Sequence, residues 1–238
     1  MFGWLFRDTR AEEFEKKHPV GFLQRPKELD ALPTLKFSAE RFVAPDEILL
    51  PNYCTQVEDQ GSVPACAGYA ASQFAENILW RKTDVPKDID PLMLYNYAKT
   101  IDGSPDVAGT TLTAVLQALL DKEIFDKTIC SIKVIRNLNQ VKYAIHKFGC
   151  CLLGMNISRE WYLCNSNRPS VYGKGDQTLI GGHAVVCCGY TSEGLMIYNS
   201  WGIDWAHYGY GLITWECAEK QFSYGAVLDN CLYDMRMN

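Results

Sequence analysis

The chain has 238 residues, a formal net charge of −5, 47% hydrophobic residues and 21% charged residues. These values exclude wholesale disorder and fit one substantial domain or two small lobes. The acidic balance and the lack of a Lys/Arg stripe argue against nucleic acid as a partner. No apolar run approaches the roughly 18 residues that a membrane span needs.

Residues 1–44 differ from the rest because they are charged and interrupted by prolines. We expect an N-terminal arm or short pro-segment here, with one helix over Thr9–Lys17. The apolar stretch Met1–Phe6 has no basic leader before it and no small-residue cleavage site after it. We therefore expect a cytoplasmic protein, or one exported without a recognisable signal peptide.

Three helices are predicted in the first half of the remaining chain. Apolar residues at helical spacing predict a helix from Cys66 to about Lys82. Asp90 is a predicted N-cap for a second helix, with Pro91 at its first position. Thr110 or Thr111 is the predicted N-cap of a third. The part from about residue 45 to 125 should therefore be a helical lobe.

The second half, about 126–238, is richer in short β-prone runs bounded by turn residues. One short helix, Val141–Phe148, interrupts them, and Ser158–Ile180 reads mostly as loop. The predicted strands are Cys130–Ile135, Cys150–Ile157, Gly182–Tyr190, Leu195–Asn199 and Tyr210–Trp215. The predicted class is α+β, with a barrel-like β lobe after the helical lobe and a ligand cleft between the two lobes.

Cys66 is a candidate nucleophile because it opens a predicted helix. A helix N-terminus carries partial positive charge and unpaired N–H groups, and both favour a thiolate. The same N–H groups can bind an oxyanion, and Gln60 in the preceding loop offers a further amide donor. On its own, Cys66 could equally be one buried cysteine among ten.

His183 and Asn199 are candidate partners for this cysteine. Each alone would be read as structural, but Gly189–Glu193 between them is a predicted five-residue hairpin loop centred on Thr191. Pairing about that centre places His183 directly opposite Asn199, close enough for a side-chain hydrogen bond. An Asn that orients a His is typical of nucleophile–base–orienter sites.

The ten cysteines are predicted to be mainly free buried thiols, because the chain is long and no signal peptide is evident. No CxxC motif occurs, which disfavours a zinc ribbon. A third possible function is that of a metal protein, with a site that combines Cys150–Cys151 or Cys187–Cys188 with a His. Adjacent strand residues point to opposite faces, which weakens it. No metal or cofactor is predicted.

Together the segments resemble the papain-like cysteine peptidase family, as a divergent member of bacterial or viral type. The family pattern Gln-Gly-Ser-x-x-x-Cys fits Gln60–Cys66, and His-Ala-Val fits His183–Val185. Asn-Ser-Trp-Gly fits Asn199–Gly202, and the following Trp-x-x-x-Gly-Tyr fits Trp205–Tyr210. The motifs occur in the family's order, and the resemblance covers about residue 45 to the end.

The resemblance implies a two-lobe fold and a peptidase acting on peptide or protein substrates through an acyl-enzyme. Cys66 would attack the carbonyl, His183 would move the proton and Asn199 would orient His183. Gln60 would bind the oxyanion. The expected substrate-binding residues are Gly109, Ala184 and Trp201, with Trp201 also shielding the His–Asn hydrogen bond.

The chain departs from the family in ways that bear on activity. Ala67 replaces the usual Trp after the nucleophile, Val63 replaces a disulfide cysteine, and Ala206 replaces a glycine. Residues 1–44 lack the family's long helical pro-region, so the sequence does not support activation by its removal. The alternative function is a catalytically weak papain-fold protein that binds peptides or proteins. Specificity and oligomeric state are not defined by the sequence.

Overall fold

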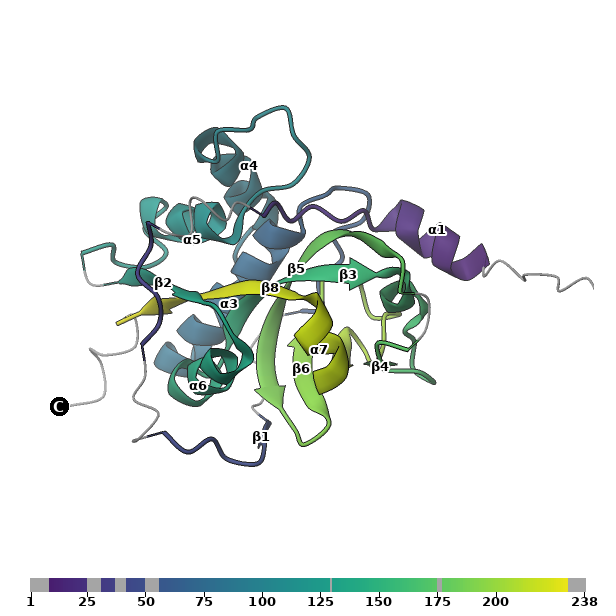
Figure 1. The fold of residues 1–238 in the computed structure, drawn as a ribbon. Coiled ribbons are helices and arrows are strands. Elements are labelled where there is room, and N and C mark those ends of the chain that lie inside the picture. Colours follow the sequence, from purple (N-terminus) through teal and green to yellow (C-terminus); the bar gives the residue numbers. More distant parts are fainter. Residues whose placement is uncertain are drawn as a thin grey trace, which may run out of the picture.

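The computed structural model describes residues 9–24, 31–36, 42–49, 56–128, 130–174 and 177–230. The fold combines helices with one large sheet and belongs to the α+β class (Figure 1). None of the helices in these ranges is long and apolar enough to cross a bilayer.

Three helices pack together near the start of the main fold: α3 (Cys66–Thr83), α4 (Pro91–Ile101) and α5 (Leu112–Asp121). Asp90 caps α4 by accepting hydrogen bonds from the backbone N–H groups of Leu92 and Met93. Thr111, one of the two expected caps, accepts from the N–H of Ala114 at the start of α5. The three predicted helices and their start signals are confirmed.

Within the described ranges, eight strands form one sheet in the order β2-β8-β3-β5-β6-β7-β4, and β1 pairs with β5 outside this path. The predicted strands are present with ends shifted by up to three residues. The sheet does not close in these ranges, so the expected barrel-like lobe is an open sheet. The strands are β1 (Ile48–Leu49), β2 (Ser131–Ile135), β3 (Cys151–Ser158), β4 (Ser170–Val171), β5 (Leu179–Tyr190), β6 (Gly194–Tyr198), β7 (Tyr210–Thr214) and β8 (Phe222–Asp229).

Several elements have no counterpart in the sequence prediction. Strand β8 lies between β2 and β3, and α7 (Trp215–Gln221) leads directly into it. The expected loop Ser158–Ile180 contains a 3₁₀ helix, η1 (Arg159–Leu163), as well as the short β4. These elements are short, so the hydrophobic period that identifies an element is barely developed in them.

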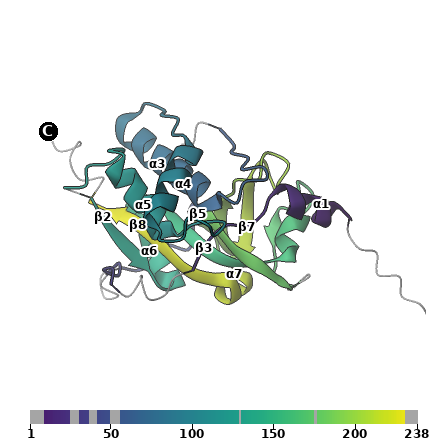
Figure 2. The ribbon, with the colours of Figure 1, turned by 90° about the horizontal axis from the view of Figure 1, so that it is seen from above.

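The sheet separates two apolar cores (Figure 2). One core joins α3, α4 and α5 to one face of the sheet, through side chains such as Phe74, Leu116 and Leu152. The other joins the opposite face to α6 (Leu138–Phe148) and α7, through residues such as Ile145 and Leu153. Adjacent β3 residues therefore serve different cores, as the period-two geometry of a strand requires.

Most of the described cysteines are buried free thiols, as predicted: Cys66, Cys150, Cys151, Cys164, Cys187, Cys188 and Cys217. Cys130 differs, because it is disulfide-bonded to a partner outside the described residues. The prediction of free thiols is therefore correct for these seven and wrong for Cys130.

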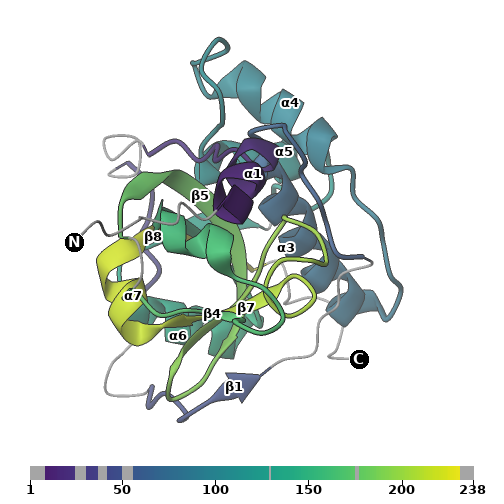
Figure 3. The ribbon, with the colours of Figure 1, turned by 90° about the vertical axis from the view of Figure 1, so that its right-hand side faces the viewer.

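The N-terminal helix α1 (Thr9–Lys17) is present as predicted and packs against η1 (Figure 3). From its end the chain runs back across the molecule, between the start of α5 and strand β5 (Figure 1). This path brings residues 18–24 across the head of α3, where the candidate nucleophile lies.

The N-cap of α5 gives a direct test of the helical part. Changing Thr111 to Ala removes the side-chain oxygen that accepts from the Ala114 N–H, so the free energy of unfolding should fall by about 1 kcal/mol. Thr111→Ser keeps an oxygen at this position and should restore most of that loss. Equal stability of the Ala variant and the unmodified chain in urea unfolding would contradict the assigned cap.

Candidate active site

Cys66 is the first residue of α3 and is completely buried. The backbone N–H groups of Ala184, the residue after His183, and of Gly21 in the N-terminal segment lie close enough to its sulfur to lower the pKa of the thiol, against the larger effect of burial. The fold therefore brings the candidate nucleophile next to Ala184, the chain neighbour of the candidate base, from elements that are more than 100 residues apart. Ala184, an expected substrate-binding residue, contacts the nucleophile itself.

His183 on β5 and Asn199 just after β6 are joined by a hydrogen bond of 2.7 Å between Nε2 and Oδ1. The Asn199 atom must be the oxygen, because it also accepts from the backbone N–H of Ser200 at 2.8 Å. His183 Nε2 is then the donor, and in the neutral ring Nδ1 carries the free lone pair. Nδ1 has no hydrogen-bond partner among the described residues. The ring is thus held in the tautomer that can accept a proton.

The predicted hairpin register behind this contact is wrong. Val186 pairs with Tyr198 and Cys187 with Ile197, and a bulge at Cys188 shifts the pairing so that Gly189 lies opposite Met196. In the register before the bulge, His183 would face residue 201. β6 ends at Tyr198, and Asn199 reaches His183 from the turn that follows.

Trp201 covers this pair, as expected from the resemblance. Its ring lies 4.5 Å from that of His183, centroid to centroid, and is buried. Trp161 contacts the His183 ring edge-on at 6.0 Å, and Tyr162 stacks on Trp201 at 4.8 Å. These rings exclude water from the His183–Asn199 hydrogen bond, which strengthens it.

Gln60 lies in the loop before α3 and is buried. Its Oε1 accepts from the Ser200 hydroxyl at 2.9 Å, which turns Nε2 the other way. Nε2 donates to the carbonyl oxygen of Pro19 at 2.8 Å and to that of Val63 at 3.0 Å. The donor expected to bind an oxyanion therefore holds a carbonyl of the N-terminal segment.

The N-terminal segment passes over Cys66 at Gly21. A Cβ added at Gly21 would lie 1.9 Å from the Pro64 carbonyl oxygen, far inside van der Waals contact. The Gly21 carbonyl accepts from the Thr110 N–H at 2.9 Å, and the Leu23 N–H donates to the Thr110 carbonyl at 2.9 Å. On the other side, the Phe22 N–H donates to the Gly182 carbonyl at 3.0 Å. The segment is thus clamped between the start of α5 and β5.

Gly109 leaves room for the segment because it has no side chain, whereas its neighbour Thr110 forms the backbone hydrogen bonds to the segment. A Cβ at Gly109 would lie 2.1 Å from the Gly21 carbonyl oxygen, and its φ is +86°. The two hydrogen bonds to the segment involve the backbone of Thr110, which the sequence indicated only as an alternative N-cap. A strand-type pairing needs only backbone groups, so the residue type at 110 carried no signal.

Phe22 fills an apolar pocket beside the clamp and is buried. Added Cβ atoms at Gly154 and Gly182 would lie 2.3 Å and 3.0 Å from its ring, so these two glycines make room for it. Tyr224 lies against it with ring centroids 5.3 Å apart.

A polar contact fixes the segment on the other side of Cys66. His18 Nε2 lies 2.9 Å from Asp59 Oδ1, and Lys17 Nζ lies 3.1 Å from Asp59 Oδ2. The Tyr162 hydroxyl donates to the His18 carbonyl at 3.0 Å. None of these residues was predicted from the sequence, because the charged N-terminal region carries no pattern that indicates where it docks.

Burial keeps both candidate catalytic groups neutral. Loss of hydration raises the pKa of Cys66 from 9.0 to about 11, against the opposing effect of the Ala184 and Gly21 N–H groups. It lowers the pKa of His183 from 6.5 to about 4, although the hydrogen bond to Asn199 acts in the opposite direction. In this arrangement the thiolate–imidazolium pair is disfavoured at neutral pH.

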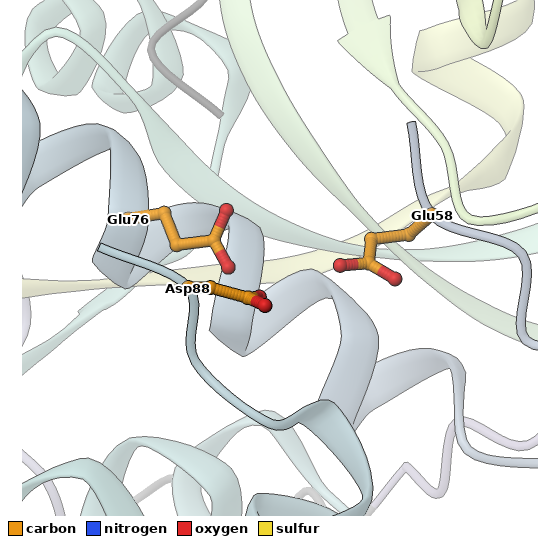
Figure 4. A group of neighbouring side chains, drawn as sticks. All are labelled: Glu58, Glu76 and Asp88. Carbon is orange, nitrogen blue, oxygen red and sulfur yellow. The ribbon is translucent and has the colours of Figure 1, made fainter. Parts of the chain in front are cut away.

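One group of carboxylates in the described ranges could hold a cation: Glu58, Glu76 and Asp88, whose oxygens lie within 4.8 Å of one another (Figure 4). Burial is the main cause that raises the pKa of Glu58 to about 7, and the negative charges of Glu76 and Asp88 add to it. Protonation of Glu58 is therefore one way to relieve the repulsion without a metal. Glu76 lies ten residues along α3 from Cys66, about 15 Å at the helical rise.

No model of a protein family matches the sequence, and no curated protein matches it significantly. Solved structures do match. Xylellain, a cysteine protease from Xylella fastidiosa, is 19% identical with a TM-score of 0.70, covering 90% of this chain and 96% of that one. Procathepsin B S9 from Trypanosoma congolense is 17% identical with a TM-score of 0.69, covering 94% and 90%.

A third match, procathepsin L 3 of the Tenebrio molitor larval midgut, is 13% identical with a TM-score of 0.63 over 92% of this chain and 78% of that one. The chain therefore has the fold of the papain-like cysteine peptidases. The resemblance read from the sequence is confirmed at the level of the fold.

The state of the thiol can be measured directly. In the unmodified full chain, Cys66 should titrate near pH 11, well above the ordinary value, because burial disfavours the thiolate. The measurement is the ultraviolet absorbance of thiolate against pH, taken as the difference between the unmodified chain and Cys66→Ala. A Cys66 thiolate already formed near pH 7 in the unmodified chain would contradict the buried arrangement.

Glu58 makes stability depend on pH. Its folded pKa of about 7 exceeds the ordinary 4.5, so its contribution to stability is full below pH 4.5 and is lost as pH rises through 7. The loss amounts to roughly 3 kcal/mol above pH 7. Glu58→Gln should therefore be stabilised relative to the unmodified chain at pH 8 but not at pH 4 in urea unfolding, and Glu219→Gln, a change at an exposed carboxylate outside this group, serves as the control. A pH-independent difference would contradict the raised pKa.

Proposed function

We propose that the protein is a cysteine-type peptidase that hydrolyses peptide or isopeptide bonds, and that its N-terminal segment keeps it latent. The observation that carries the proposal is the 2.7 Å hydrogen bond between His183 Nε2 and Asn199 Oδ1, with Cys66 at a helix N-terminus beside the same strand. This is a nucleophile, a base in the correct tautomer and a group that orients the base.

The proposed reaction begins when His183 Nδ1 takes the thiol proton of Cys66 and the sulfur bonds to the substrate carbonyl carbon. The oxyanion that forms is bound by the Cys66 N–H and by Gln60 Nε2. Collapse of this intermediate breaks the C–N bond, and His183 gives the proton to the leaving amine. Water then adds to the thioester, again with His183 as base, and releases the acid and the free thiol.

Latency follows from what the segment occupies. The Pro19 carbonyl takes the Gln60 donor, Gly21 lies over the sulfur, and Gly21–Leu23 pairs with Thr110 and Gly182. A substrate needs the same donor and access to the same sulfur, so it cannot bind while the segment is docked. Procathepsins, which are precursors by name, are among the similar structures and support this reading.

The segment is held by short-range contacts, so a small change should release it. Gly21→Ala adds a Cβ that cannot fit against the Pro64 carbonyl. In the full chain this variant should raise kcat/KM for a mixed peptide pool at least about tenfold, since undocking the segment frees the site. Lys16→Ala, a change at an exposed position of α1, should have little effect.

Cys66→Ala and His183→Ala in the Gly21→Ala chain should each abolish turnover. A folded Gly21→Ala chain whose Cys66 alkylates rapidly but which cleaves no peptide would favour the alternative, a papain-fold binding module. Equal activity of the unmodified chain and Gly21→Ala would argue against latency while leaving the peptidase proposal intact.

A further inference from the structure

Asp59 occupies a position next to the proposed reaction centre. It directly precedes Gln60 in the chain, its backbone forms a β-bridge with Trp201, and its Oδ1 accepts from the Gly61 N–H at 2.9 Å. It therefore belongs to the body of the enzyme and stays in place when the N-terminal segment leaves. Its side chain is 39% exposed even with Lys17 and His18 docked on it.

The chemistry of the proposed reaction defines which end of a substrate passes Asp59. The leaving amine must lie on the His183 side of the scissile carbon, because His183 protonates it. Trp201 packs on His183 at 4.5 Å, and the bridge to Trp201 places Asp59 on that same side. The acyl end extends the other way, along Thr110 and Gly182, where Gly21–Leu23 now lies.

The docked segment places a cation, Lys17, and the imidazole of His18, whose pKa is lowered by burial, on the leaving-group side. Lys17 Nζ and His18 Nε2 each lie within 3.1 Å of an Asp59 carboxylate oxygen, two and one residues before Pro19 respectively. The neighbouring hollow, about 510 Å³ in volume, also contains Asp204, and Lys17 is the only cation among the residues that line it. Once the segment leaves, the body presents carboxylates there.

Asp59 is suited to hold a cation. The Gly61 N–H and the two basic groups together keep the pKa of its carboxyl below 3.8, against the effect of burial, and the N–H contribution does not depend on the segment. A carboxylate fixed by a backbone N–H is already oriented when a new cation arrives, so less entropy is lost on pairing.

We propose that Asp59 selects substrates that carry a Lys or Arg side chain within two residues after the scissile bond. This inference rests on the proposed peptidase function and names its substrate class. In the latent chain, Lys17 and His18 occupy the same carboxylate, so the segment and a basic substrate compete for it.

The test uses the full-length Gly21→Ala chain, in which the cleft is open. Three peptides are compared, identical except for Lys, Gln or Glu at the two positions after the scissile bond. The Lys peptide should be cleaved with a kcat/KM about three- to tenfold above that of the Gln peptide, and the Glu peptide should be the poorest. Because the kcat/KM values of the peptides are compared as ratios within one enzyme variant, a change in its overall activity cancels.

Asp59→Asn in this background should bring the Lys-to-Gln ratio close to one, and Asp59→Lys should make Glu the better residue. Asp204→Asn is the matched control, because Asp204 lines the neighbouring hollow and, within the described part of the chain, forms no hydrogen bond or ion pair with Lys17 or His18. Its ratio should stay within about twofold of the parent. A preference lost in Asp204→Asn but kept in Asp59→Asn would overturn the assignment.

A second measurement separates this inference from the proposed function. If none of the peptides is cleaved, the peptidase proposal fails, and binding is read from the peptide concentration that halves the alkylation rate of Cys66. Cation selection is still supported if the Lys peptide protects Cys66 at a lower concentration than the Glu peptide does. Asp59→Asn should abolish this difference between the two peptides. Equal protection by the Lys, Gln and Glu peptides would overturn it.

Discussion

The latent arrangement depends on a short strip of extended backbone, Pro19 to Leu23, that fits between α5 and β5 without a side chain at Gly21. Its carbonyl and N–H groups take up the Gln60 donor, approach the Cys66 sulfur and pair with Thr110. Backbone groups buried without partners would be costly, so each of these hydrogen bonds offsets the desolvation that docking requires. The perturbed pKa values of the site follow from this cover.

The candidate base, His183, and the residue proposed to orient it, Asn199, are held by contacts outside the segment. His183 and Asn199 are held by their own strands, by the Ser200 N–H and by the surrounding aromatic rings. The proposed switch between latent and active states is therefore a change in burial at a site that is already assembled.

Sequence reasoning succeeded where the signal was local. The start of α3 and the Asp90 and Thr111 caps are each encoded within a few residues. The prediction of the hairpin register was wrong because the bulge at Cys188 has no clear local signature in the sequence. The docking of Pro19–Leu23 could not be foreseen, since its partners Gln60, Thr110 and Gly182 lie roughly 40 to 160 residues away and mostly contribute backbone groups.

The central claim is that the segment lies in the cleft in solution. Amide hydrogen exchange of Phe22 and Leu23, measured by NMR on the full chain, tests it most directly, because their N–H groups donate to Gly182 and Thr110 only when the segment is docked. The account predicts strong protection of both amides, lost together when Gln60 is changed to Ala or when Gly21 is changed to Ala. Exchange of both amides at the rate of an unstructured peptide in the unmodified chain would contradict it.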